Sequence, residues 1–183
     1  MVAARAGQKR RLVRLSAFFS LFAVVALAGI PAYVAPASGE AAAVFVKKIP
    51  SRYRDWRFVS VAREEAPLDD IRVILGNDIA IKAYREAKLP FPDGAILTRL
   101  AYRYEPSEEN NASFGRQQSF VAGHPKNGVQ FMVKNSKKYA ATGGWGYAQF
   151  NDGTAVDDSL LEPCYPCHQA VKSRDFVFTR YAP

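Results

Sequence analysis

The sequence runs Ala95-Ile96-Leu97-Thr98-Arg99-Leu100-Ala101-Tyr102-Arg103-Tyr104 directly after the turn Pro90-Phe91-Pro92-Asp93-Gly94. Large apolar and aromatic side chains recur here at every second position, which is the period typical of a β-strand. We therefore predict a strand over residues 95–104. One face of that strand carries Ile96, Thr98, Leu100, Tyr102 and Tyr104.

Further strands are predicted on both sides of this one. They cover the apolar runs 58–62, 72–75, 129–133, 145–150 and 176–179. A helix capped by Asn77 or Asp78 is expected to run to about Ala87. A short helix that starts at Asp157 or Asp158 leads to Cys164. Residues 105–128 are polar and contain turn-forming residues, so we expect a long hairpin connection there.

The order of these elements favours an α+β fold, in which a mostly antiparallel β-sheet carries a few helices. The 183 residues suffice for one domain. We place that domain at residues 53–183. It follows an N-terminal region of residues 1–37 and a flexible segment of residues 38–52.

Residues 1–37 have the three parts of a secretory signal peptide. Five basic residues lie within the first 14 positions, and an apolar run follows from Leu15 to Ile30. Ala35-Pro36-Ala37 supplies the small residues for a cut after Ala37. The apolar run is shorter than the roughly 20 residues of a bilayer span, although an uncleaved membrane anchor stays open as an alternative. In both cases we expect the remainder to lie in the periplasm.

The charge of the chain is concentrated in this region. There are 25 Lys and Arg residues against 17 Asp and Glu, which gives a net charge of +8. Because five basic residues belong to residues 1–14 and the first acid is Glu40, the exported part is only mildly basic. A weak surplus gives no electrostatic case for DNA or RNA, so nucleic acid is not an expected partner.

The only two cysteines belong to the stretch Cys164-Tyr165-Pro166-Cys167-His168. This is the C-x-x-C-H pattern that attaches haem c. Two intervening residues let the two sulfurs reach the two vinyl groups of one porphyrin, and the adjacent imidazole then reaches the iron. We predict one covalent haem c, attached through Cys164 and Cys167, with His168 as the iron ligand.

Two other uses of these cysteines stay open. One is a disulfide between Cys164 and Cys167, although a redox dithiol normally opens a helix in a βαβ unit rather than lying near the C-terminus. The other is a zinc site, which needs four ligands and has only His124 as an obvious fourth.

The second axial position of the iron decides the function. Only 15 residues follow His168, and none is Met or His. Two upstream candidates for a sixth ligand are Met132, in an apolar strand pattern, and His124, in a loop pattern. Because each has a simpler interpretation, as core or as surface, we favour five-coordinate iron with an open position for a small ligand.

The chain resembles the cytochrome P-460 family, which includes the cytochromes c-prime-beta, over residues 53–183. The resemblance rests on several blocks besides the haem motif. They are Leu75-Gly76-Asn77, Phe91-Pro92-Asp93-Gly94, Val129-Gln130-Phe131-Met132-Val133-Lys134 before Lys137-Lys138-Tyr139, Gly143-Gly144-Trp145-Gly146 and Asp175-Phe176-Val177-Phe178. The resemblance implies a mostly antiparallel β fold with one haem c near the C-terminus, NO as a ligand, and a homodimer.

The catalytic P-460 type oxidises hydroxylamine and bonds a lysine to the porphyrin edge. At the corresponding position this chain has Arg99, and no lysine occurs between Lys88 and Lys126. A guanidinium stays protonated and is a poor nucleophile. Arg99 is therefore expected either to pair with a haem propionate or to be a solvated strand residue. Lys134 is a weaker substitute for the lysine, with a surface or sheet-edge position as the simpler interpretation.

Three functions follow from these observations. The first is capture of NO or a related small nitrogen or oxygen species at open iron. The second is an oxidoreductase on hydroxylamine, NO or peroxide, for which Arg99, Glu105, Glu108 or Glu109 would act as acid or base. The third is an electron carrier with Met132 or His124 as sixth ligand and a periplasmic redox partner.

Four aromatic residues are expected either to line the haem pocket or to fill the core, namely Phe91, Tyr102, Phe131 and Trp145.

A cleaved signal peptide predicts a mature protein that begins at Ser38. N-terminal sequencing of the protein recovered from the periplasm of a bacterial host measures this directly. Recovery of a chain that still starts at residue 1, in the membrane fraction, would instead identify the region as an anchor.

Overall fold

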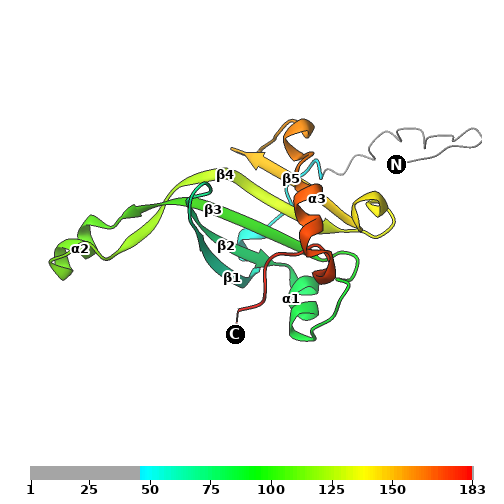
Figure 1. Cartoon of the computed structure of the whole chain (residues 1–183), viewed down its shortest axis with the longest axis horizontal. Helices are drawn as coiled ribbons and strands as arrows, with labels where there is room; N and C mark the ends of the chain where they lie inside the picture. The colour runs from blue at the N-terminus through cyan, green and yellow to red at the C-terminus, as the bar shows by residue number, and fades with distance from the viewer. Residues whose placement is uncertain (1–45, 183) are drawn as a thin grey trace, which may run out of the picture. The chain divides into compact units, whose positions relative to one another are not determined.

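The computed structural model describes residues 46–182 (Figure 1). The predicted signal peptide, residues 1–37, and the first part of the segment 38–52 lie outside the described residues. Within the described range, no helix combines the length and the apolar character needed to cross a bilayer.

The described residues form one antiparallel sheet in which strands that are neighbours in sequence are also neighbours in space. The strands are β1 (Arg57–Glu64), β2 (Asp70–Gly76), β3 (Ile96–Pro106), β4 (Phe120–Lys134), β5 (Trp145–Asn151) and β6 (Thr154–Ala155). The α-helices are α1 (Asp78–Arg85), α2 (Glu108–Phe114) and α3 (Cys164–His168). Short 3-10 helices cover Tyr53–Asp55, Ala140–Thr142, Asp158–Leu161 and Gln169–Arg174. The predicted α+β class is confirmed.

Asn77 shows how the sequence sets an element boundary. Its side-chain oxygen accepts from the backbone N–H of Ala80 (3.0 Å), which caps α1, and from that of Ile96 (3.1 Å). Its amide nitrogen donates to the carbonyl of Gly94 (2.8 Å). One side chain therefore fixes both the first turn of α1 and the start of β3, as the predicted cap required.

Alternation along the strands gives the sheet two apolar faces. Leu97, Met132 and Tyr147 lie side by side across β3, β4 and β5 and belong to one core cluster. Their chain neighbours Phe131 and Ala148 point the other way and belong to a second cluster.

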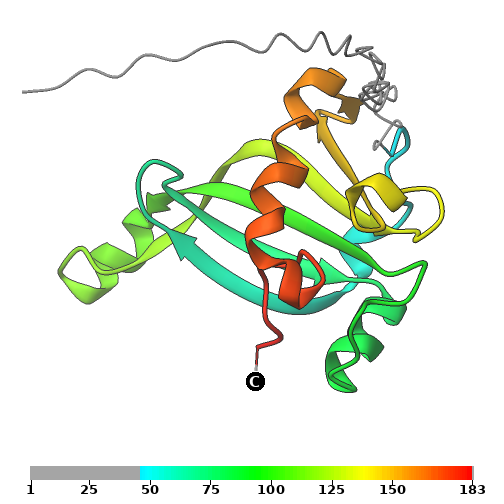
Figure 2. The ribbon, with the colours of Figure 1, turned by 45° about the vertical axis from the view of Figure 1, so that its right-hand side comes forward.

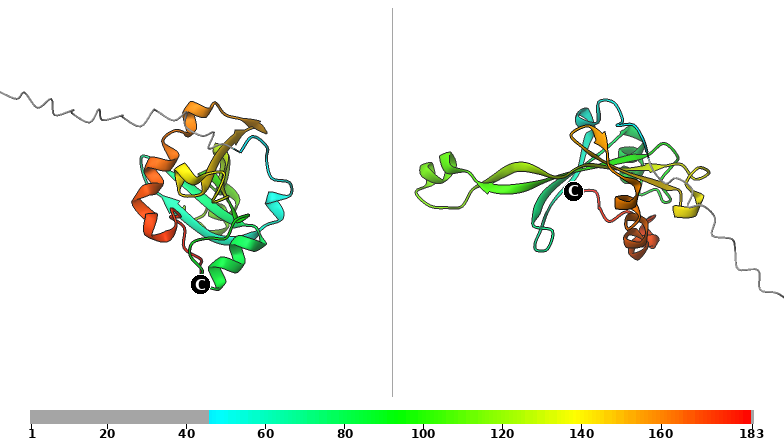
Figure 3. Two further views of the ribbon diagram at one scale, coloured as in Figure 1. Left: turned by 90° about the vertical axis from the view of Figure 1, so that its right-hand side faces the viewer. Right: turned by 90° about the horizontal axis from the view of Figure 1, so that it is seen from above.

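Different segments cover these two faces. α3 and the chain that follows it cross the face of Leu97, Met132 and Tyr147, here called the α3 face, and Phe176 and Val177 are buried against it (Figures 2 and 3). Residues of the N-terminal segment pack against the second cluster, namely Val46, Ile49, Tyr53 and Trp56. The sheet thus separates two layers. One consists of the N-terminal segment, and the other carries the Cys-x-x-Cys-His motif.

The polar stretch 105–128 is not the long connection that the sequence predicted. β3 runs on to Pro106 and β4 begins at Phe120, so only residues 107–119 connect the two strands, and they contain α2. The outer halves of β3 and β4 form a ribbon that projects from the sheet, with α2 at its tip (Figure 1). Backbone pairing does not require apolar side chains, so a ribbon with water on both sides has the composition of a loop.

The predicted strand over residues 176–179 is also wrong. Asp175 and Phe176 have φ values of 52° and 63°, which belong to a left-handed turn and cannot continue a strand. Phe176 and Val177 are nevertheless buried, because they fill the core on the α3 face. A short apolar run shows that a segment is buried but does not show its backbone conformation.

Phe131 tests the second cluster. It is 2% exposed and meets Tyr53, Trp56 and Phe150 edge to face. Phe131→Ala removes these contacts and should lower the free energy of unfolding by about 3–5 kcal/mol. Denaturant unfolding measures the change. Phe114→Ala, at the exposed end of α2, is the matched control and should leave stability nearly unchanged. Equal losses in the two variants would contradict the assigned core.

Candidate haem site

α3 presents the two cysteines at neighbouring positions of one helix face, because they are three residues apart. The N–H of Cys167 donates to the carbonyl of Pro163 (3.1 Å) and closes the first turn. Both thiols are free, so the structure contains no disulfide between them. Cys164 packs against the core cluster of the α3 face, and its burial raises the pKa of its thiol, as does the neighbouring Cys167.

His168 lies between the rings of Tyr147 and Phe178, at centroid distances of 5.2 and 5.0 Å. Its Nδ1 is 2.6 Å from the carbonyl oxygen of Phe176. Because a carbonyl can only accept, Nδ1 carries the hydrogen and the neutral ring keeps a lone pair on Nε2. Burial lowers the pKa of His168, while the bond to Phe176 acts in the opposite direction. A neutral imidazole with this tautomer is the form that binds iron.

The hydroxyl of Tyr147 is buried and has no hydrogen-bond partner among the described residues. Its side chain is 4% exposed and its ring lies beside His168. Burial raises the pKa of Tyr147, and Cys164 adds to the increase, so the hydroxyl stays protonated at neutral pH. A buried polar atom without a partner costs about 1–3 kcal/mol. The position of this one, beside the motif, fits a bound group that can accept a hydrogen bond.

Arg99 lies on the α3 face, two residues along β3 from Leu97. Of the two roles predicted for Arg99, a partner of a haem propionate or a solvated strand residue, the second is wrong. The Arg99 side chain is 17% exposed and donates to Asp70 Oδ2 (2.8 Å) and Gln130 Oε1 (2.8 Å). Asp70 is fully buried and also pairs with Arg72 at 2.7 Å. Burial and the charge of Arg72 lower the pKa of Arg99, whereas Asp70 raises it.

The sequence predicted a position for Lys134 at the surface or at a sheet edge, and this prediction is wrong. Lys134 is 4% exposed and its ammonium forms an ion pair with Asp175 at 2.7 Å. The sequence did not reveal the burial of Lys134, because the carboxylate that compensates its charge lies 41 residues further along the chain. An ammonium held in this way is not available as a free nucleophile.

The two candidates for a sixth iron ligand lie in different places. His124 is exposed on the outer half of β4, in the ribbon that projects away from α3 (Figure 1). A zinc site that used it together with Cys164 and Cys167 is therefore not assembled. Met132 lies on the α3 face, in register with Leu97 and Tyr147, and packs in the core.

The four aromatic candidates divide between the faces. Phe131 and Tyr102 pack in the second cluster, on the side of the sheet away from α3, and cannot wall a group bound there. Phe91 and Trp145 are in the core cluster of the α3 face. The acid or base candidates lie on the projecting ribbon and are exposed, namely Glu105, Glu108 and Glu109.

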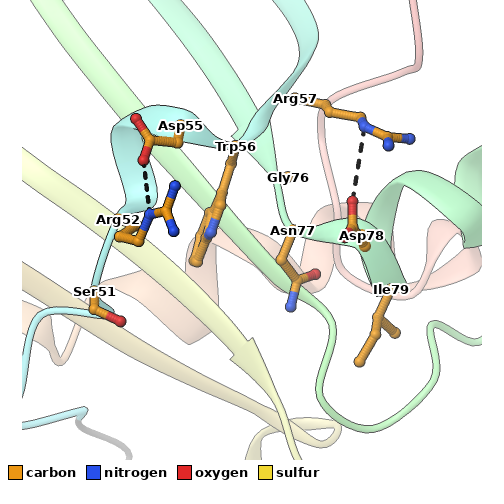
Figure 4. Close-up of a pocket in the computed structure, with 9 residues that line it drawn as sticks. All are labelled: Ser51, Arg52, Asp55, Trp56, Arg57, Gly76, Asn77, Asp78 and Ile79. Atoms are coloured by element: carbon orange, nitrogen blue, oxygen red, sulfur yellow. Dashed lines mark hydrogen bonds and ion pairs between the residues drawn. The ribbon is translucent and has the colours of Figure 1, made fainter.

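An open cleft of about 630 Å³ lies elsewhere, between residues 51–57 and 76–79 (Figure 4). Its rim carries the ion pairs Arg52–Asp55 (2.9 Å) and Arg57–Asp78 (3.7 Å). It contains no residue of α3, and its charged side chains are already paired. The cleft is separate from the cysteine and histidine site.

The family model described as Cytochrome P460 matches residues 50–179, which is more than half of the chain. The chain belongs to the cytochrome P460 family. No curated protein matches the chain. Family membership makes this protein a haem-binding cytochrome, and the predicted resemblance is confirmed.

The residues of this cytochrome P460 fit a haem at α3. Cys164 and Cys167 are free thiols on one helix face, and His168 is in the tautomer that leaves Nε2 as a donor to iron. The unpaired hydroxyl of Tyr147 lies within the same group of side chains.

Sequence reasoning did not find Tyr147, the Phe176 carbonyl or the partner of Lys134. Tyr147 occupies a core position of β5, where an aromatic residue is ordinary and carries no signal of function. Phe176 acts through its backbone, which a side-chain pattern does not reveal. The one available signal was the block Asp175-Phe176-Val177-Phe178, which the resemblance had already singled out.

The attachment through α3 predicts that Cys164→Ala with Cys167→Ala removes all covalently bound haem. Each thiol forms one thioether by adding its sulfur to one vinyl carbon and its hydrogen to the other, so a single variant retains one bond. Haem staining after denaturing electrophoresis and intact mass measure the result. Haem that stays covalently bound in the double variant would contradict the assignment, because the chain has no other cysteine.

Proposed function

We propose that this member of the cytochrome P460 family is a periplasmic mono-haem c protein that binds NO or a related small nitrogen species. Cys164 and Cys167 attach the haem, and His168 holds the iron. When bound, the haem supplies an iron whose position opposite His168 is open to a small ligand. The side chains of this chain hold, orient and shield that group.

The observation that carries the proposal is the state of the His168 ring. The Phe176 carbonyl accepts the hydrogen of Nδ1, so the ring offers Nε2 as a neutral donor. The rings of Tyr147 and Phe178 pack on the imidazole and limit its rotation. A single fixed, neutral imidazole is the arrangement expected for a histidine that ligates haem iron.

The chain has few side chains that could occupy the opposite position. It contains two histidines and two methionines, and one of the methionines is Met1. His124 is exposed on the projecting ribbon, and Met132 is packed between Leu97 and Tyr147 in the sheet. His124 therefore lies away from His168, and we take the half-buried Met132 as a core residue of the α3 face. On this basis we favour an open iron position over a second protein ligand of the kind that an electron carrier has.

Hydroxylamine oxidation is the less favoured alternative. Arg99 stands where the catalytic type has its lysine, and its guanidinium is engaged by Asp70 and Gln130. Lys134, the substitute candidate, is paired with Asp175. With both cations engaged, no described residue of β3 or β4 on the α3 face offers a free amine for a bond to the porphyrin. Arg99 remains a candidate partner of a haem propionate.

Export by the predicted signal peptide places the protein in the periplasm, the compartment in which haem c is assembled. A periplasmic redox partner would reduce or oxidise the iron between ligand-binding events. The family resemblance also favours a homodimer. These two partners are part of the proposal.

The proposal predicts a ferrous optical spectrum of high-spin, five-coordinate iron in the haem-loaded protein, with a clear shift on addition of NO. Met132→Leu should leave that spectrum unchanged, because Leu replaces Met in a core at small cost. His124→Ala, on the exposed ribbon, is the second control. Incubation with hydroxylamine should give no turnover.

Two outcomes would contradict the proposal. A low-spin ferrous spectrum without added ligand, lost in Met132→Leu, would make the protein a six-coordinate electron carrier. Sustained oxidation of hydroxylamine would make it an enzyme of the catalytic type despite Arg99.

A further inference from the structure

Lys134 and Asp175 form a buried ion pair on the α3 face. Lys134 Nζ lies 2.7 Å from Asp175 Oδ1 and 2.9 Å from Oδ2, and the two side chains are 5% and 7% exposed. The ammonium also donates to the carbonyl of Gly143 (3.0 Å) and lies 5.0 Å from the centre of the Trp145 ring. Removing one charge of such a pair leaves the other buried and uncompensated, so the two residues depend on each other.

The other contacts of Asp175 fix the backbone around it. Its Oδ2 accepts from the N–H of Phe91 (2.8 Å), and its carbonyl accepts from Trp145 Nε1 (2.8 Å). Asp175 and Phe176 both have positive φ, a backbone conformation that is unfavourable for residues other than glycine. Such a conformation persists only where the surroundings impose it. Lys134, Phe91 and Trp145 supply those constraints through Asp175.

This turn directs the carbonyl of Phe176 at His168 Nδ1, at 2.6 Å. The ring of Phe176 is held as well, because it packs beside Tyr165 and against Gly143. A Cβ at Gly143 would lie 2.2 Å from that ring, so only glycine leaves room for it. A continuous series of contacts therefore leads from Lys134 through Asp175 and Phe176 to His168.

We propose that Lys134 and Asp175 are positioning residues that set the orientation and donor strength of His168 through the Phe176 carbonyl. The inference rests on the proposed function, in which His168 is the iron ligand. A carbonyl that accepts from Nδ1–H makes Nε2 a stronger donor, and a stronger donor favours ferric over ferrous iron. The ion pair thus tunes the iron without touching it.

The test uses three variants of the haem-loaded protein. Asp175→Asn and Lys134→Met each remove one charge, and the double variant removes both and leaves no lone buried charge, which protects the fold. A loosened turn weakens the bond between His168 Nδ1 and the Phe176 carbonyl. All three variants should therefore show a lower ferrous iron–histidine stretching frequency by resonance Raman spectroscopy and a higher reduction potential than the wild type.

Two controls separate positioning from stability. Asp158→Asn breaks a different Lys–Asp ion pair, the exposed pair with Lys47. This variant should keep the stretching frequency and the reduction potential of the wild type. Phe131→Ala lowers stability from the opposite face of the sheet and should also leave them unchanged.

The inference would be overturned if the double variant had the iron–histidine stretching frequency and the reduction potential of the wild type. This holds whatever the stability of that variant. The failure of the proposed function is seen separately, in the wild type. A protein that does not bind NO but shows the raised potential in Asp175→Asn refutes the ligand and keeps the positioning role. A wild type without haem refutes both.

Discussion

The hydrogen bond between His168 Nδ1 and the Phe176 carbonyl is the contact on which the site depends. It selects the tautomer of the imidazole and joins α3 to the segment that follows it. Phe176 can offer its carbonyl only because the chain turns with positive φ at this residue and at Asp175. The turn in turn rests on a buried ion pair with Lys134 at the end of β4. A contact at the end of a strand thus supports the turn that holds the imidazole on a separate helix.

The two faces of the sheet serve different purposes. On one face, the N-terminal segment closes a conventional apolar core around Phe131 and Phe150. The α3 face is more varied, because it combines apolar residues such as Leu97 with the buried charges of Asp70 and Arg99. Buried charges and an unpaired hydroxyl are costly in a core that only stabilises a fold. The buried charges and the hydroxyl of Tyr147 on the side of the Cys-x-x-Cys-His motif are what a cofactor site would explain, whereas the second face carries the buried unpaired hydroxyl of Thr98.

Elements with local signals were predictable from the sequence. The cap at Asn77, the alternation in β3 and the spacing of the cysteines all act within a few residues. The projecting ribbon was missed because its exposed strands have a loop-like composition, and the strand at residues 176–179 was wrong because burial alone does not specify extended backbone. The burial of Lys134 was missed because it requires a carboxylate supplied by a distant segment.

The sequence by itself determined that two thiols and an imidazole lie within five residues at the spacing typical of haem c attachment. It also determined which residues can form a sheet, because the period of two is a property of the extended chain. Only the tertiary structure decided which face receives α3, which nitrogen of His168 stays free and which charge compensates Lys134. These depend on contacts between residues far apart in the chain, and such contacts exist only after the backbone has folded and excluded water from between them.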